Sequence, residues 1–191
     1  MERITEVIAF WRDEVGPERW YQSNEELDRT IRERFEALWQ AAHDGELDDW
    51  ADTPRGALAL VILCDQLPRN MFRGQPKSFA TDRRARETAD RAIAEGYDMA
   101  IDDPLRQFFY VPFLHSESLL DQERGVELYE DRMPDEHLRH ARAHRAVIAR
   151  FGRFPWRNPW IGRATSDEEA AFLWAGGYDW AVRAERKNKV A

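Results

Sequence analysis

Apolar residues recur at helical spacing along most of the chain. Residues 3–14 carry such a stripe and predict a first helix, which Gly16-Pro17 ends. A second stripe predicts a helix that runs to Gly45, with a capping box in Ser23-Asn24-Glu25-Glu26 and a solvated outer face that includes Asp28. No segment shows the period of two that is typical of a β-strand, so the pattern predicts helices throughout.

Two segments are apolar on every side and predict buried helices. The first, residues 57–64 (ALALVILC), follows Thr53-Pro54, which places a capping residue before a proline at the first helical position. The second, residues 105–120 (LRQFFYVPFLHSESLL), follows Asp103-Pro104. Pro112 predicts a kink inside this second helix, because proline has no N–H and its ring clashes with the preceding turn.

The remaining segments predict elements that are mostly amphipathic. A fourth helix begins at Thr81-Asp82, which caps it, and ends at Glu95-Gly96. The others are a charged helix over residues 121–133 interrupted by Gly125, a long helix opened by Asp135-Glu136, an irregular loop over residues 152–163, and a last helix capped by Thr165–Glu169 that runs through Trp174.

These elements together predict an all-α protein. Seven to eight antiparallel helices with short connections favour stacked helix hairpins in a tetratricopeptide-like (TPR-like) superhelix. Length predicts a single helical domain over residues 1–182, followed by a polar tail over residues 183–191.

Composition narrows the class of protein. The formal net charge of −8 argues against general nucleic-acid binding. The single cysteine, Cys64, lies in the apolar run and excludes a disulfide framework. The first residues are charged and do not resemble a signal peptide, and the longest apolar run is too short to cross a membrane. We therefore expect a cytoplasmic protein without membrane contact.

Charge is distributed unevenly along the chain. Residues 137–166 carry seven arginines and no Asp or Glu, a formal charge of +7, so the rest of the chain sums to −15. Clustered guanidiniums repel one another unless carboxylates or a bound anion offset them. Two interpretations follow: the loop over residues 150–163 is a preorganised anion site, or its arginines are consumed by carboxylates of the buried helices.

Two other uses of this stretch receive less support. His137, His140 and His144 share one helix face, as metal ligands can, but the interleaved arginines would repel a divalent cation. Base stacking on Trp156 and Trp160 would suit RNA, but the rest of the chain is acidic. We expect no metal, no cofactor and no nucleic acid.

Polar groups also end the two buried segments. Asp65, Gln66, Arg69, Asn70 and Arg73 follow the first, and His115, Ser116 and Glu117 lie near the end of the second. A carboxylate is not buried alone, so Asp65 and Glu117 each need a donor. We expect the arginine loop to supply both.

Three segments resemble a known bacterial family. They are LCDQLPRNMFRG, FFYVPFLHSE and HRAVIARFGRFPWRNPWIGRATSDEE, and together they are similar to the domain-of-unknown-function family 924, over residues 5–178. The resemblance implies a TPR-like helical fold and no established activity. The matching positions are Asp65, Gln66, Arg69, Asn70, Arg73, Pro112, His115, Ser116, Glu117, His144, Arg150, Phe151, Gly152, Arg153, Pro155, Arg157, Asn158, Gly162 and Arg163. Trp156 departs from the family pattern, which commonly has histidine there, and we interpret it as a packing position for a ring.

The residues favour a binding protein. Our main hypothesis is a concave, arginine-rich site for a small anion or an acidic peptide segment. One alternative is an acid–base hydrolase that uses Glu117 or Asp65 with His115 or His144, so enzymatic activity stays open. The other is a purely structural arginine–carboxylate network in a protein-interaction module. The oligomeric state is not predicted. The candidate ligand-binding residues are Asp65, Arg69, Asn70, Arg73, His115, Glu117, His144, Arg150, Arg153, Arg157, Asn158 and Arg163.

Overall fold

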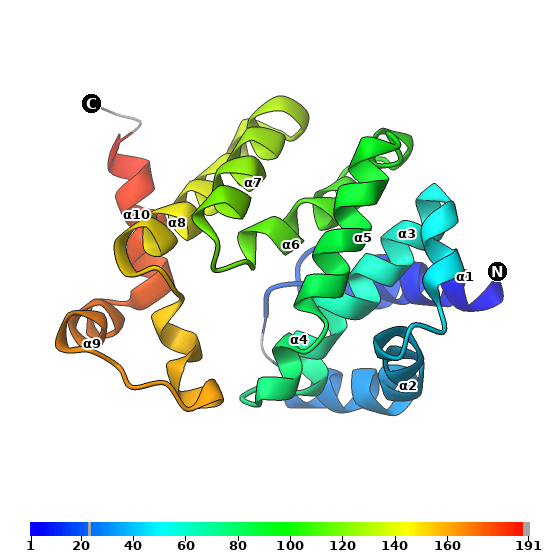
Figure 1. Cartoon of the computed structure of the whole chain (residues 1–191), viewed down its shortest axis with the longest axis horizontal. Coiled ribbons are helices and arrows are strands. Elements are labelled where there is room, and N and C mark those ends of the chain that lie inside the picture. Colours follow the sequence, from blue (N-terminus) through cyan, green and yellow to red (C-terminus); the bar gives the residue numbers. More distant parts are fainter. Residues whose placement is uncertain (23, 189–191) are drawn as a thin grey trace. The chain divides into compact units, whose positions relative to one another are not determined.

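The computed structural model describes residues 1–22 and 24–188, together with the side chains up to residue 185 (Figure 1). Over these ranges 76% helix and no strand confirm the all-α prediction. Two compact units divide the chain, Met1–Pro112 and the part from Phe113 onward. The single domain over residues 1–182 and the TPR-like stacking stay predictions.

The first unit is built from two long amphipathic helices around a buried one. Every residue from Gly56 to Cys64 is buried, which confirms that the third predicted helix is covered on all sides. Thr53 caps this helix as predicted, since its side chain accepts a hydrogen bond from Gly56 N at 3.2 Å. The helices of this unit are α1 (Glu2–Ala9) with a π-helical extension (Phe10–Val15), α2 (Glu25–His43), α3 (Pro54–Val61) continued by a π turn (Ile62–Gln66) into α4 (Leu67–Met71), and α5 (Asp82–Ala94).

Two predicted caps differ from the structure. The α2 cap predicted at Ser23 lies outside the described residues, and Asn24 is the N-cap, accepting from Glu26 N and Leu27 N. Thr81 does not cap α5 with its side chain. Its hydroxyl donates to Cys64 O and accepts from Trp39 Nε1, because a buried hydroxyl gains more from two partners in the core than from the helix end.

The helix predicted over residues 105–120 is wrong. The chain forms a 3₁₀ helix (Leu105–Phe109) and one short helical turn, α6 (Val111–Leu114), and then leaves helical geometry before Leu119. The Gln122 amide donates to the carbonyls of Phe113, Leu114 and Ser116 at 3.3, 2.8 and 2.7 Å. A buried side chain therefore satisfies carbonyls that a continued helix would have satisfied with its own backbone.

The second unit contains the remaining helices. Helix α7 passes through Gly125 without interruption, against the prediction. A Cβ at Gly125 would lie 2.6 Å from Leu114 Cδ2, so close packing explains this glycine. The elements are α7 (Leu119–Arg132), α8 (Asp135–Phe151), a 3₁₀ helix (Pro155–Ile161), α9 (Asp167–Trp174) and α10 (Gly177–Asn188).

Helix α8 confirms the predicted long helix. It buries Leu138, Ala141, Val147 and Ile148, and Gly152 ends it in the left-handed conformation (φ 67°). Helix α10 was missed, and residues 183–188 of the predicted tail belong to it.

No helix in residues 1–22 and 24–188 is long and apolar enough to cross a membrane. The cytoplasmic location stays a prediction.

Substitution of Gly56 tests the packing of α3. In Gly56→Ala the new Cβ would clash with the backbone oxygen of Trp50 and approach Thr53 Oγ1 to 2.8 Å. Because backbone does not yield easily, we expect a loss of about 2–3 kcal/mol in the free energy of unfolding, measured by urea denaturation. Arg83→Ala, an exposed control on α5, should change it by less than about 0.5 kcal/mol. An unchanged free energy of unfolding in Gly56→Ala would contradict this account of the close approach between Gly56 and Trp50.

Candidate functional site

The predicted site residues of the first unit form ion pairs and hydrogen bonds with carboxylates. Arg73 donates to both oxygens of Asp28, from Nε at 2.7 Å and Nη2 at 3.0 Å, and Asn70 Nδ2 donates to Asp28 Oδ1 at 2.8 Å. Asp28 is only 8% exposed, so its prediction as part of a solvated face is wrong. The three residues join α2 to the end of α4.

Arg69 makes a second pair in the same unit. Its guanidinium lies 2.7 Å from Asp82 Oδ1 and 3.7 Å from Asp65 Oδ1, stacks over Phe79 and donates to Ser78 O. Asp65 is fully buried and also accepts from Gln66 Nε2 at 2.5 Å. These contacts give Asp65 donors within its own unit, and its pairing with the arginine loop stays a prediction.

In the second unit the loop arginines meet carboxylates, as one interpretation of the sequence predicted. Arg163 donates from both terminal nitrogens to Glu117, at 2.7 and 2.9 Å, and Glu117 Oε1 also accepts from Phe154 N at 2.8 Å. Burial raises the pKa of Glu117, but Arg163 and the Phe154 N–H favour the charged form more strongly, and the pKa is lowered overall. Glu117 therefore stays ionised, and its carboxylate is engaged by Arg163 and the Phe154 N–H.

A second carboxylate, Glu169, has more partners still. Arg153 donates to both of its oxygens, at 2.6 and 2.8 Å, and Ser166 N and Asn158 Nδ2 donate to Oε2 at 2.8 and 3.3 Å. The Ser166–Glu169 pair forms a capping box inside the cap predicted over Thr165–Glu169. Hydrogen bonds from Arg153 lower the pKa of Glu169 to about 2, against the opposing effect of burial.

Arg150 and Arg157 have different surroundings. Arg150 pairs with Glu168 at 2.9 Å on the surface, where both side chains are well exposed. Arg157 is only 8% exposed, stacks over the Phe154 ring at 4.6 Å and donates from Nη2 to His115 O at 2.9 Å. Only Arg157 among these four arginines is thereby placed beside the two histidines of the predicted site.

The histidines lie in a cluster of rings. The His144 ring is 4.6 Å from Tyr178, 5.7 Å from Phe154 and 6.3 Å from His115, centroid to centroid. Trp156 stacks on Phe154 at 4.8 Å and meets Tyr178 edge-on, in agreement with its interpretation as a packing position. We call these five residues, together with Arg157, the ring cluster.

His144 is held in a single tautomer. Burial, and after it the neighbouring His115, lowers the pKa of His144 to about 3, so the imidazole is neutral near pH 7. Its Nδ1 lies 2.8 Å from His140 O and must donate to it. Nε2 is then a bare acceptor, and it has no partner within residues 1–22 and 24–188.

The search for relatives agrees with the family resemblance. A family model described as a bacterial protein of unknown function, DUF924, matches residues 7–177. This chain belongs to that family. It is also similar to the solved structure of a protein of unknown function, ATU0120, from Agrobacterium tumefaciens, with 40% sequence identity and a TM-score of 0.86. That match covers 91% of this chain and 97% of the other chain. Curated proteins yielded no match.

The structure does not support a metal site on the helix face that carries His137, His140 and His144. Within the part of the chain that the structure describes, no group of three His, Cys, Asp or Glu residues could hold a metal ion. His140 Nδ1 is instead 2.8 Å from Tyr178 OH, and Arg139 Nε donates to His140 Nε2 at 3.3 Å.

Several residues of these networks were missed as site residues, among them four on helices. Asp28, Asp82, Glu169 and Tyr178 each complete a contact of a predicted residue. Only Glu169 had a signal in the sequence, the Ser-x-x-Glu spacing of its capping box. The other three come from different helices, and periodicity within one helix does not identify the partner on another.

Burial of neutral His144 predicts a pH dependence of stability. The unfolded chain takes up a proton at His144 below about pH 6.5, but the folded chain does not until about pH 3. The stabilisation that neutral His144 gives to the folded state is therefore complete above pH 6.5 and is lost as the pH falls. Between pH 7.5 and 5 the advantage of the wild type over His144→Phe in free energy of unfolding should shrink by about 2 kcal/mol.

Urea denaturation at several pH values measures this advantage. Arg83→Ala, which removes an exposed arginine of α5 that stays charged throughout this range, serves as the control and should differ from the wild type by a nearly constant amount. An advantage over His144→Phe that does not change with pH would show that His144 titrates alike in both states.

The Arg153–Glu169 pair predicts a second effect, at lower pH. Glu169→Gln should cost about 2–3 kcal/mol at pH 7, because it removes the charge on which Arg153 and two further donors converge. Since the folded pKa of about 2 lies below the unfolded value of about 4.3, the cost should persist to pH 5 and decline toward pH 2. Glu168→Gln, which alters the neighbouring exposed pair, should cost less than about 0.5 kcal/mol. If urea denaturation gave Glu169→Gln and Glu168→Gln the same loss in free energy of unfolding, the stabilising role assigned to the Arg153–Glu169 pair would be contradicted.

Proposed function

We propose that this protein binds a small oxyanion that also carries a hydroxyl group, at the ring cluster of the second unit. The observation that carries the proposal is the bare Nε2 acceptor of His144 beside the permanent charge of Arg157. An acceptor and a cation side by side complement a ligand with an O–H donor next to an anionic oxygen. Hydroxycarboxylates and hydrogen phosphate have this arrangement.

The other loop arginines contribute indirectly. Arg153 and Arg163 are matched by Glu169 and Glu117 in two-point contacts, so their charge is neutralised where they lie. Both pairs fasten the segment that carries Phe154 and Arg157. In this proposal the predicted arginine-rich site is narrower than the sequence suggested: most guanidiniums hold the loop, and Arg157 serves the ligand.

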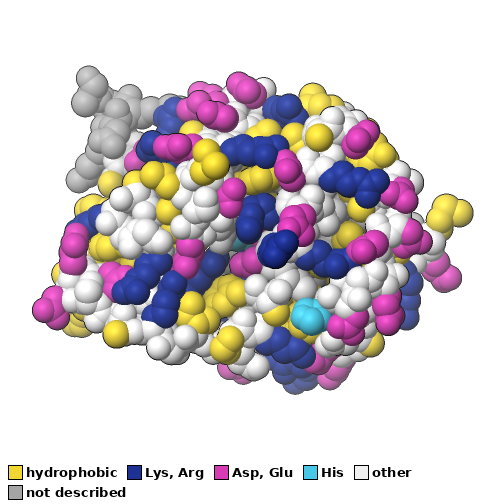
Figure 2. All heavy atoms as spheres, in the orientation of Figure 1, with side chains coloured by type: hydrophobic (Ala, Val, Ile, Leu, Met, Phe, Trp, Pro, Cys, Tyr) yellow, Lys and Arg dark blue, Asp and Glu magenta, His cyan; other side chains and the backbone are white. Residues whose placement is uncertain are grey.

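The surface supports recognition of a small ligand rather than of a long polyanion. On the face shown in Figure 2, basic and acidic side chains are interspersed, without a broad field of one sign. Backbone recognition of nucleic acid favours a continuous basic stripe. The absence of a nucleic-acid partner stays a prediction.

The acid–base alternative receives less support from the same geometry. A general base works best with a pKa near the working pH, and His144, at about 3, is a weak base. Glu117 accepts three hydrogen bonds and has a lowered pKa, so it is a poor proton donor. An acceptor that stays neutral is better suited to binding than to proton transfer.

Binding of malate and succinate tests the proposal. The two dicarboxylates differ by one hydroxyl, which His144 Nε2 would accept. We expect malate to bind about tenfold more tightly in titration calorimetry, because its hydroxyl can donate a hydrogen bond to His144 Nε2 that succinate cannot make. At 100 times its Kd the ligand should raise the free energy of unfolding by about 2.7 kcal/mol.

Two variants and a control locate the site. His144→Phe keeps the ring and should abolish the preference for malate, and Arg157→Gln should weaken both ligands. Arg142→Ala, in an exposed pair with Glu130 on α7, should change neither affinity. Absence of binding by malate, succinate and phosphate would favour the structural alternative, in which the whole network only stabilises the fold. If an acidic peptide binds and this binding is lost in Arg157→Gln, the ligand of the site is a peptide carboxylate and not a small oxyanion.

A further inference from the structure

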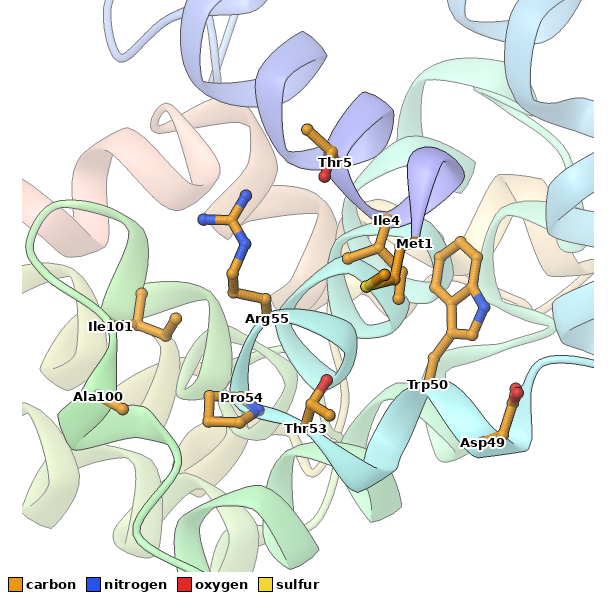
Figure 3. A pocket seen from close by; sticks show the side chains of 10 residues that line it. All are labelled: Met1, Ile4, Thr5, Asp49, Trp50, Thr53, Pro54, Arg55, Ala100 and Ile101. Carbon is orange, nitrogen blue, oxygen red and sulfur yellow. The ribbon is translucent and has the colours of Figure 1, made fainter.

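A cavity lies in the first unit, formed by residues that the ring cluster does not include. It has a volume of about 580 Å³ and lies between α1, the 3₁₀ helix Asp48–Asp52, the start of α3 and residues 100–101 (Figure 3). Cavities that hold small molecules measure roughly 300–1,000 Å³. The space is therefore large enough for a ligand of several carbon atoms.

Most of the side chains around this cavity are apolar. Ile4, Trp50, Pro54 and Ile101 line it, and Figure 3 shows the Trp50 ring beside Ile4. Walls of this kind gain free energy by covering an aliphatic or aromatic body, about 0.8 kcal/mol for each CH₂ group removed from water. The cavity thus favours a ligand with an apolar body.

A guanidinium faces the same space. Arg55 extends from the first turn of α3 toward α1, on the side where Thr5 lies (Figure 3). Within residues 1–22 and 24–188 its guanidinium has no hydrogen bond and no ion pair. This sets it apart from Arg69, Arg73, Arg153, Arg157 and Arg163, each of which has a carboxylate or carbonyl partner. An unpaired planar guanidinium beside apolar walls complements one carboxylate in a two-point contact.

The lining also limits the charge of the ligand. Asp49 lies at the rim beyond Trp50 and would repel a second negative charge. Arg55 is the one basic side chain among the lining residues of this cavity. The carboxylate of Asp49 therefore favours a monoanion over a dianion such as a phosphate monoester.

We propose that this cavity binds a monocarboxylate with an aliphatic or aromatic body of roughly six to ten carbon atoms. The carboxylate lies against Arg55, and the body covers Ile4, Trp50 and Ile101. The site is independent of the ring cluster in its residues and in the chemistry of its ligand, so either proposal stands if the other fails.

Octanoate is the probe, and titration calorimetry with the full chain is the measurement. We expect a Kd below about 1 mM for the wild type, and a weakening of about tenfold in Arg55→Ala, which removes a charged hydrogen-bond donor. Arg55 is exposed, so the variant should fold normally. Arg83→Ala, an exposed arginine of the same unit, is the matched control and should bind octanoate like the wild type.

Two further measurements separate this site from unspecific binding. With ¹³C-labelled isoleucine methyl groups, octanoate should shift the signals of Ile4 and Ile101 and leave that of Ile148 in the second unit unchanged. Octylamine has the same body and the opposite charge, and should bind at least about tenfold more weakly. Octanoate binding that survives in Arg55→Ala, equal binding of octylamine, or no shift at Ile4 and Ile101 would each overturn the proposal.

Discussion

The ion pair between Glu117 and Arg163 is the contact on which the second unit depends. The carboxylate of Glu117 accepts from both terminal nitrogens of Arg163 and from the backbone N–H of Phe154. It thereby joins the segment before α7 to both ends of the 3₁₀ helix Pro155–Ile161, although 46 residues separate Glu117 from Arg163 along the chain. A loop with two prolines in its 3₁₀ helix has few backbone hydrogen bonds of its own, and side-chain pairs must define its path.

The same constraint divides the arginines by role. A two-point pair with a carboxylate neutralises a guanidinium and fixes its orientation, which suits Arg153 and Arg163 to holding the loop. Arg157 has other contacts, since it stacks on Phe154 and donates to the carbonyl of His115. The aromatic residues Phe154 and Tyr178 pack against His144, and its burial keeps that imidazole neutral. The acceptor and the cation of the proposed site are both consequences of how the loop is anchored.

Periodicity predicted the helices that are amphipathic or fully buried, because their apolar stripes reflect the core directly. It failed at residues 105–120, where an apolar run does not distinguish one helix from a 3₁₀ turn and a break that Gln122 satisfies. The pairing of Glu117 with the arginine loop was predictable, since a carboxylate-free basic segment needs partners. Asp28 was not, because whether a charge on one helix is solvated depends on which residues of α4 lie opposite. Sequence thus predicted the kind of network and could not assign every partner.

A double-mutant cycle on Glu117 and Arg163 tests the central claim most directly. The free energy of unfolding is measured by urea denaturation for the wild type, Glu117→Gln, Arg163→Met and the double variant. If the pair anchors the loop, the coupling energy should be about 1.5–3 kcal/mol, and each single variant should cost nearly as much as the double variant. A coupling energy below about 0.5 kcal/mol would contradict the account, because the two residues would then stabilise the second unit independently.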